Sequence, residues 1–243
     1  KDPTGHHHSR VPRAYRILRR FFRSLVTVWF REINIVDDEN LPPEGGIIFI
    51  AWHPSGLIDP MLMNASLPGR VSIIAKHTLF KLPLVGRLLR AAGGVPIERA
   101  QDSGDQAAAS ARNSKLLSGA SSVVAKGGRL MIFPEGTTHT GSEVKRVRSG
   151  AGRILLAARR QAQKEGFAEP QLVPIGLHYS NSQRFRERAA VMIERAMVFD
   201  PIPKEVDDDV LQDQLDRAWV KDVTDAIGVE LKRASLSKTS WRE

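Results

Sequence analysis

From residue 47 onward, short apolar runs alternate with longer stretches of helical periodicity. The apolar runs cover residues 47–52, 71–75, 94–97, 130–133 and 172–177. The helical stretches between them lie near residues 60–65, 79–92, 105–126 and 151–164. Apolar strands that alternate with helices indicate a mostly parallel sheet with helices on both faces. The sequence therefore predicts an α/β fold built around a mostly parallel central sheet.

Two further segments follow these repeats along the chain. Residues 190–198 form another apolar run, which we expect to add an edge strand to the sheet. Residues 205–233 carry apolar side chains at helical spacing and predict an amphipathic C-terminal helix. Its inward-facing positions are expected to be Leu211, Leu215, Trp219, Val223 and Ile227.

The N-terminal part of the chain has the pattern of a basic amphipathic helix that begins near Pro12. Its apolar side carries Leu18, Phe21, Phe22, Leu25, Val28 and Trp29. The opposite side carries Arg13, Arg16, Arg20, Arg23 and Arg31. The uncharged run at residues 24–30 is far shorter than the ~20 apolar residues that a membrane span requires. Such a helix either packs on the body of the protein or lies on a membrane surface.

These patterns divide the chain into three parts. Residues 1–10 are interpreted as a disordered leader or a cloning remnant, because three consecutive histidines stand there near glycine and proline. Residues 11–36 are the predicted amphipathic membrane-docking helix, and residues 37–243 are the predicted α/β domain.

The net charge of the chain is +9, from 36 basic and 27 acidic side chains, and it is unevenly placed. Residues 1–32 hold eight basic side chains against two acidic ones. A basic arm on a nearly balanced body points to a polyanion, either a nucleic acid or an anionic membrane surface. The aromatic side chains lie opposite the arginines instead of between them, so the arm lacks a base-stacking surface. We therefore expect an anionic membrane and no nucleic acid as the partner.

Several chemistries are excluded by what the sequence lacks. It contains no cysteine, which excludes disulfides, cysteine-ligated metals and a cysteine nucleophile. A mean hydropathy of −0.25 is too polar for a bundle of membrane spans. No G-x-S-x-G, G-x-x-x-x-G-K-[ST], G-x-G-x-x-G or H-E-x-x-H motif occurs, so serine hydrolases, P-loop NTPases, Rossmann dehydrogenases and zincins lose their main support. We expect neither a metal nor a cofactor.

A histidine and a carboxylate follow the first apolar run closely. His53 comes directly after residues 47–52, and Asp59 stands six positions later. A continuous helix would turn the two side chains about 240° apart, but Pro54 and Gly56 favour a loop in which they can meet. A carboxylate beside a histidine is typical of a general base whose tautomer is held by its partner. In the alternative interpretation, His53 is structural and Asp59 caps the helix that begins near Pro60.

Anion-binding groups follow two later strands and precede a helix. The turn at residues 134–138 offers glycine, hydroxyl and backbone N–H groups, and Arg99 stands at another strand end. A basic cluster just before the helical stretch 151–164 consists of Lys145, Arg146 and Arg148. A plain turn and solvated surface charges remain the alternatives for each of these features.

Four segments in this order resemble the superfamily of glycerol-3-phosphate and lysophosphatidic acid acyltransferases. They are HPSGLID at 53–59, IIAKHTLFKLPLVGRLLRAAGGVPIER at 73–99, FPEGTT at 133–138 and VPIGLHYS at 173–180. The resemblance covers roughly residues 40–200. It implies an α/β acyltransferase domain that moves a fatty acyl group from an acyl-CoA or acyl-carrier-protein thioester to a hydroxyl of a glycerol phosphate lipid.

Two departures from the common pattern stand out. Five residues separate His53 from Asp59, where the commonest first motif has four. This longer form, with QRFRERA at 183–189, resembles the branch related to fungal glycerol-3-phosphate and dihydroxyacetone phosphate acyltransferases. Thr138 stands where an arginine is usual, which shifts phosphate binding toward Arg99, Lys76 and the basic cluster.

The resemblance implies a role for each candidate residue. His53 would take the proton of the acceptor hydroxyl, and Asp59 would orient the imidazole and favour its charged form. The acceptor phosphate would be held by Arg99, Gly136, Thr137 and Lys76, supported by Lys145 and Arg148. Glu135 would orient the neighbouring loops or His53. Transfer would be direct, without an acyl-enzyme, since no cysteine exists and no serine has the context of a nucleophile.

The expected function is therefore the acylation of 1-acylglycerol-3-phosphate to phosphatidic acid. Glycerol-3-phosphate and dihydroxyacetone phosphate are the alternative acceptors, and a non-catalytic membrane-binding relative is the alternative class. The resemblance implies a peripheral location on the cytoplasmic face of a membrane, because bacterial and eukaryotic enzymes of this superfamily face the cytosol.

Overall fold

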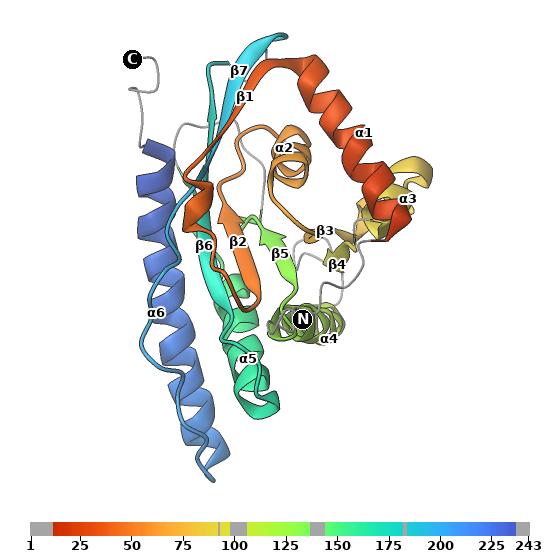
Figure 1. Ribbon diagram of the computed structural model, residues 1–243. Coiled ribbons are helices and arrows are strands. Elements are labelled where there is room, and N and C mark those ends of the chain that lie inside the picture. Colours follow the sequence, from red (N-terminus) through yellow and green to blue (C-terminus); the bar gives the residue numbers. More distant parts are fainter. Residues whose placement is uncertain (1–11, 92, 98–105, 137–143, 182–183, 237–243) are drawn as a thin grey trace, which may run out of the picture.

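The computed structural model describes residues 12–91, 93–97, 106–136, 144–181 and 184–236 (Figure 1). The leader expected at residues 1–10 lies outside these ranges.

Within the described ranges, the strands form one seven-stranded sheet in the order β1-β7-β6-β2-β5-β3-β4 (Figure 1). The strands are β1 (Phe30–Val36), β2 (Ile47–Ala51), β3 (Val71–Lys76), β4 (Val95–Ile97), β5 (Arg129–Ile132), β6 (Gln171–Tyr179) and β7 (Glu187–Ile193). All neighbouring strands are parallel except the antiparallel pair β6 and β7. The predicted α/β fold with a mostly parallel sheet is confirmed.

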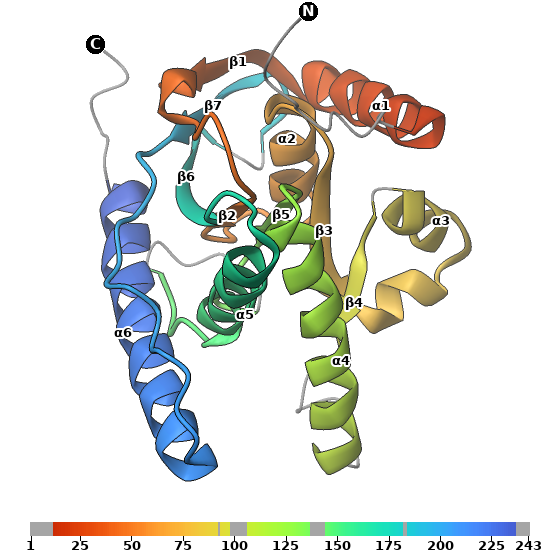
Figure 2. The same cartoon turned by 60° about the horizontal axis from the view of Figure 1, so that its bottom comes forward.

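Both faces of the sheet are covered, as the apolar runs predict. The helices are α1 (Arg13–Trp29), α2 (Ile58–Ser66), α3 (Pro83–Ala91), α4 (Gln106–Ala125), α5 (Gly150–Glu165) and α6 (Asp209–Leu236), with short 3-10 helices at Asp38–Asn40 and His77–Lys81. Ile48 and Ile50 of β2 pack in one core cluster with α4, α5 and α6, whereas Ile47, Phe49 and Ala51 pack in another with α2. Figure 2 shows α5 between α4 and α6.

The N-terminal segment differs from the single helix expected at residues 11–36. Helix α1 ends at Trp29, and Phe30–Val36 form the outermost strand, parallel to β7. The physical reason is that β7 offers a free edge whose backbone groups pair with β1, while Phe30 enters the core. For the same reason β7 is not the edge strand that was expected at residues 190–198.

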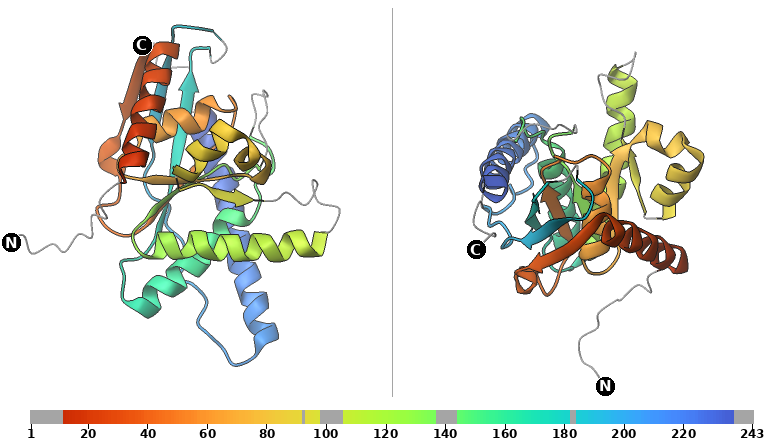
Figure 3. Two further views of the ribbon diagram at one scale, coloured as in Figure 1. Left: turned by 90° about the vertical axis from the view of Figure 1, so that its right-hand side faces the viewer. Right: turned by 90° about the horizontal axis from the view of Figure 1, so that it is seen from above.

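Helix α1 packs on the body and at the same time exposes much of its apolar side. Tyr15, Leu18 and Val26 are buried, and the helix contacts α2 and α3 (Figures 1 and 3). The Tyr15 hydroxyl accepts a hydrogen bond from the backbone N–H of Val71 at 2.9 Å. Of the helices that the structure describes, none has the length and apolar character needed to cross a membrane.

Helix α6 corrects part of the predicted inward face. Trp219, Val223 and Ile227 are buried as expected, but Leu211 and Leu215 are exposed. The first turns of α6, which contain Leu211 and Leu215, extend past the end of the sheet (Figure 1).

Candidate active site

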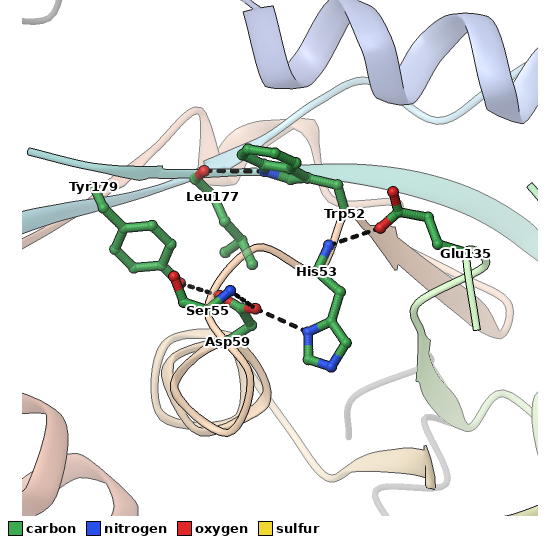
Figure 4. A network of polar contacts seen from close by, with 7 residues as sticks. All are labelled: Trp52, His53, Ser55, Asp59, Glu135, Leu177 and Tyr179. Carbon is green, nitrogen blue, oxygen red and sulfur yellow. Dashed lines mark hydrogen bonds and ion pairs between the residues drawn. The ribbon is translucent and has the colours of Figure 1, made fainter. Parts of the chain in front are cut away.

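The loop after β2 brings His53 and Asp59 into contact. β2 ends at Ala51, and α2 begins at Ile58, so Asp59 lies in the first turn of that helix. Gly56 turns the loop between them with a positive φ of 61°. His53 Nδ1 lies 2.8 Å from Asp59 Oδ2 (Figure 4). The side chain of His53 is 16% exposed and that of Asp59 is fully buried.

Two further donors hold the Asp59 carboxylate. The backbone N–H of Ser55 donates to Oδ2 at 2.8 Å, and the hydroxyl of Tyr179 donates to Oδ1 at 2.6 Å (Figure 4). Burial, followed by the charge of Asp59 and the hydrogen bond to it, raises the pKa of Tyr179 well above its ordinary value. Tyr179 therefore stays protonated and remains a donor to Asp59.

Tyr179 is a site residue that the sequence interpretation missed. It ends β6 and lies 120 residues from Asp59 in the chain. The available signal was its place in the segment VPIGLHYS, where a phenol follows a buried strand at the same sheet edge as His53.

One face of the His53 imidazole packs against an aromatic ring. The ring of Phe133, which follows β5, stacks on it with centroids 4.1 Å apart and planes 17° apart. The indole N–H of the preceding Trp52 donates to the carbonyl of Leu177 at 3.2 Å. Figure 4 shows the second ring nitrogen, Nε2, on the side away from Asp59. When Nδ1–H donates to Asp59, Nε2 of the neutral ring carries the lone pair that can accept a proton.

Glu135 ties the loop of His53 to the basic cluster. Its side chain is 2% exposed. One carboxylate oxygen accepts the backbone N–H of His53 at 3.0 Å, and the other accepts that of Lys145 at 2.7 Å. The backbone N–H of Arg148 donates to the carbonyl of Pro134 at 2.8 Å. The carboxylate of Glu135 thus connects the two loops.

The site opens into a cavity of about 1210 Å³, called here the active-site cavity. His53 lines it together with Lys76, Gly136 and Arg148. The rest of its wall is mostly apolar and includes Phe21, Phe22, Leu25, Met61, Ile73, Val85, Leu88, Leu89 and Met131. Such a wall suits a fatty acyl chain, and the cationic groups suit a phosphate.

Gly136 brings a cation close to the turn after β5. It has a positive φ of 67°, and a Cβ at this position would lie 3.0 Å from Nε of Arg148. Glycine therefore suits this position, because another residue would be strained at this φ and its Cβ would crowd the guanidinium.

Three further candidates are Arg99, Thr137 and Lys145. Arg99 and Thr137 are outside the described residues. The side chain of Lys145 lines a second hollow instead of the active-site cavity. Across the described ranges, no three His, Asp or Glu side chains form a group that could hold a metal ion.

Comparison with known proteins relates this site to a family of enzymes. A 1-acyl-sn-glycerol-3-phosphate acyltransferase of Borreliella burgdorferi is 26% identical over 133 residues, which cover 54% of this chain and 50% of that protein. An uncharacterized acyltransferase of Schizosaccharomyces pombe is 23% identical over 248 aligned residues, which cover 69% of this chain and 36% of that protein. The chain therefore spans half or less of the length of these curated relatives.

A solved structure shares the fold, and a family model matches the sequence. The crystal structure of the 1-acyl-sn-glycerophosphate acyltransferase PlsC from Thermotoga maritima has a TM-score of 0.55 at 18% identity, over 88% of this chain and 79% of that one. The family model described as Acyltransferase matches residues 32–178. These residues include the loop after β2 from His53 to Asp59, as well as Glu135, Gly136 and Arg148. Since that match spans more than half of the sequence, this chain belongs to the acyltransferase family.

Proposed function

We propose that this protein transfers a fatty acyl group from a thioester to the free hydroxyl of 1-acylglycerol-3-phosphate and so makes phosphatidic acid. The observation that carries the proposal is the 2.8 Å contact between His53 and the buried Asp59 at a cavity that is apolar and also cationic. The names of the relatives from Borreliella burgdorferi and Thermotoga maritima support this acceptor. Glycerol-3-phosphate and dihydroxyacetone phosphate are the alternative acceptors.

His53 acts as the general base in the first step. An alcohol is a poor nucleophile at neutral pH, so its proton must leave as its oxygen attacks the thioester carbonyl. Nε2 of His53 takes that proton, and Asp59 stabilises the imidazolium through Nδ1–H. In the second step, the tetrahedral intermediate expels the thiolate of the donor. The imidazolium of His53 then protonates this thiolate. The acyl group passes directly to the acceptor, and His53 is neutral again.

The phosphate of the acceptor places its hydroxyl near His53. Lys76, Gly136 and Arg148 line the same cavity as the imidazole, so a phosphate held there keeps the hydroxyl close to the base. Arg99 and Thr137 are assigned to this phosphate from the sequence motifs alone.

Helix α1 docks the protein on an anionic membrane, on the cytoplasmic side. The helix exposes Ile17, Phe21, Leu25, Val28 and Trp29. Phe21 and Leu25 also line the active-site cavity, which gives a lipid chain an apolar route from the membrane toward His53. The exposed arginines of α1 add electrostatic attraction to anionic lipids of about 1 kcal/mol each.

The test of this function is an acceptor panel with labelled donor. Purified protein receives a labelled acyl-CoA or acyl-carrier protein with 1-acylglycerol-3-phosphate, glycerol-3-phosphate or dihydroxyacetone phosphate. We expect the label in phosphatidic acid. His53→Ala is expected to lower kcat by about 10²- to 10⁴-fold, the usual contribution of a general base.

Comparing lysolipid binding with turnover distinguishes an acyltransferase from a non-catalytic lipid-binding protein. His53→Ala should keep its affinity for 1-acylglycerol-3-phosphate in vesicles, because the phosphate-binding groups are intact. If the unsubstituted protein transfers no label from any donor to any acceptor, the proposed acyl transfer is excluded. That result would favour a non-catalytic membrane-binding relative. Full turnover by His53→Ala would exclude the role of the imidazole.

A further inference from the structure

A second hollow adjoins the active-site cavity and has no role in the mechanism above. It is a groove of about 2030 Å³ between residues 144–149, α5 and α6. Arg148, Ser149, Arg153 and Ala157 line both hollows, so the two spaces meet near the N-terminal end of α5. We propose that this groove, called here the donor groove, binds the phosphate-bearing nucleotide end of a CoA thioester. This inference rests on the proposed acyl transfer.

The donor groove has an excess of cations without anionic partners. Within the described part of the chain, six of its basic side chains form no ion pair, namely Lys145, Arg146, Arg148, Arg153, Lys164 and Lys232. Three of its carboxylates are each paired with a cation of the same groove: Asp213 with Arg217, Asp216 with Arg160, and Asp225 with Lys221. Glu165 and Glu205 of the lining form no ion pair with a described residue either, so the six unpaired cations outnumber the unpaired carboxylates and suit a ligand with several phosphate groups.

One wall of the groove combines cations with open space. Arg153, Ala157 and Lys164 are exposed on the same side of α5 and line the groove. Ala157 leaves room between the two cations, where a longer side chain would fill the groove. The first turn of α5 contains no acidic residue, and Ser149 makes no side-chain capping bond there, so no carboxylate or hydroxyl competes for the helix N–H groups.

The groove has a fixed position relative to the catalytic imidazole. The carboxylate of Glu135 accepts backbone N–H groups from both His53 and Lys145, at 3.0 and 2.7 Å. A CoA thioester has its reactive carbonyl and its phosphates at opposite ends of a flexible pantetheine arm. With the carbonyl at His53 and the acyl chain in the active-site cavity, that arm can pass Arg148 and Arg153 into the donor groove.

The charge of the outer wall favours CoA over an acidic carrier protein. Helix α6 exposes Asp213, Asp222 and Asp225 along the groove and beside it. A small polyanion can lie along α5 without meeting these carboxylates, whereas an acidic protein docked across the groove would face Asp222, which has no ion-pair partner among the described residues. The concave shape of the groove likewise suits a small ligand.

Binding of 3′,5′-ADP, the nucleotide part of CoA, tests the site without any turnover. Calorimetry is done on the full chain at fixed ionic strength, with the variant Lys164→Gln/Lys232→Gln, whose two residues line the donor groove but not the active-site cavity. We expect the affinity for 3′,5′-ADP to fall by about tenfold or more, since each cation can make a charge-assisted hydrogen bond to phosphate. Arg195→Gln is the matched control, because Arg195 is exposed and lines neither hollow.

Two donors that differ only in the nucleotide test the same site during catalysis. In the variant Lys164→Gln/Lys232→Gln, we expect KM for acyl-CoA to rise by about tenfold or more. KM for acyl-pantetheine, KM for the acceptor and kcat should stay within about twofold. These retained values would show that the active-site cavity is intact.

Three results would overturn the donor groove as a CoA site. The first is an equal affinity for 3′,5′-ADP in the variant and the unsubstituted chain. The second is an equal rise of KM for acyl-CoA and for acyl-pantetheine in the variant. The third is turnover with acyl-carrier protein as the donor and none with acyl-CoA. If no donor supports acyl transfer, the proposed function fails, and calorimetry with 3′,5′-ADP still decides whether the groove binds the nucleotide.

Discussion

The carboxylate of Asp59 is surrounded by three donors from two places in the chain. His53 and Ser55 come from its own loop, whereas the Tyr179 hydroxyl comes from the far end of β6. Tyr179 also stacks on Phe30, with ring centroids 5.6 Å apart. The orientation of the proposed catalytic pair therefore depends on a residue that touches no reacting atom in the proposed mechanism, which makes Tyr179 a positioning residue in our proposal.

Removing the Tyr179 hydroxyl tests this dependence. Tyr179→Phe leaves the buried Oδ1 of Asp59 without its donor at 2.6 Å. We expect the free energy of unfolding to fall by about 1.5–3 kcal/mol, the usual range for a hydrogen bond to a charged group. We also expect kcat to fall while KM for the acceptor stays the same, because the phosphate-binding groups are untouched. Urea unfolding and steady-state kinetics measure the two effects.

The pH dependence distinguishes this hydrogen bond from simple packing. Because burial and Asp59 raise the pKa of Tyr179, the folded chain holds the phenolic proton more tightly than the unfolded chain. The contribution is full below about pH 10, the ordinary pKa of tyrosine, and falls as pH rises above it. The stability difference between the unsubstituted chain and Tyr179→Phe should therefore shrink above about pH 10. A difference independent of pH would contradict the assignment.

At the scale of elements, α1 divides its apolar side between two environments. Tyr15, Leu18 and Val26 face the body, while Ile17 and Val28 face outward. The sequence pattern placed Leu18 and Val28 on one apolar side, but helical periodicity does not tell which flank of that side the neighbouring helix will cover. Both interpretations of the helix, packing on the body and docking on a membrane, therefore remain compatible with one structure.

Vesicle binding tests the outward flank of α1. Val28 is 59% exposed, and Val210 on α6 is 68% exposed, so the two residues form a matched pair. We expect Val28→Ser to weaken binding to anionic phospholipid vesicles by about fivefold, which corresponds to about 1 kcal/mol of lost apolar burial. Val210→Ser should bind as the unsubstituted protein does. Equal effects of the two substitutions in a sedimentation assay would exclude α1 as the docking element.

β1 shows why an element can escape sequence interpretation. Its residues include Arg31, Glu32 and Asn34 and continue the charged pattern of α1. Phe30–Val36 become a strand because they pair with β7, about 150 residues later in the chain. A local pattern contains no information on such a partner, so the boundary at Trp29 could not be predicted.

At the scale of the whole molecule, stability and the site draw on different parts of the structure. Ile227 of α6 packs with α4, α5 and the strands in one core cluster. Phe49, Leu62 and Ile175 belong to the other cluster, on the face where α2 carries Asp59. A substitution in the core cluster that contains Ile227 should therefore lower the free energy of unfolding without changing the geometry of His53 and Asp59.

Ile227→Ala tests this division. We expect the free energy of unfolding to fall by about 2–5 kcal/mol, the range for removing a large aliphatic side chain from a core. Leu211→Ala on the same helix is the control, and its exposed position should limit the change to about 0.5 kcal/mol. Specific activity measured well below the melting temperature should be similar in both variants. A large loss of kcat in folded Ile227→Ala would instead show that α6 supports the site.

The α/β fold and the His53–Asp59 pair could be predicted because they depend on local patterns. Alternating apolar runs and helical stretches determine the class of the sheet, and Pro54 and Gly56 allow the short loop that joins the pair. The contact of Tyr179 with Asp59, the place of β1 and the meeting of two hollows at Arg148 and Arg153 follow from folding. They join segments far apart in the chain, and periodicity records which side of an element is apolar but not which partner covers it.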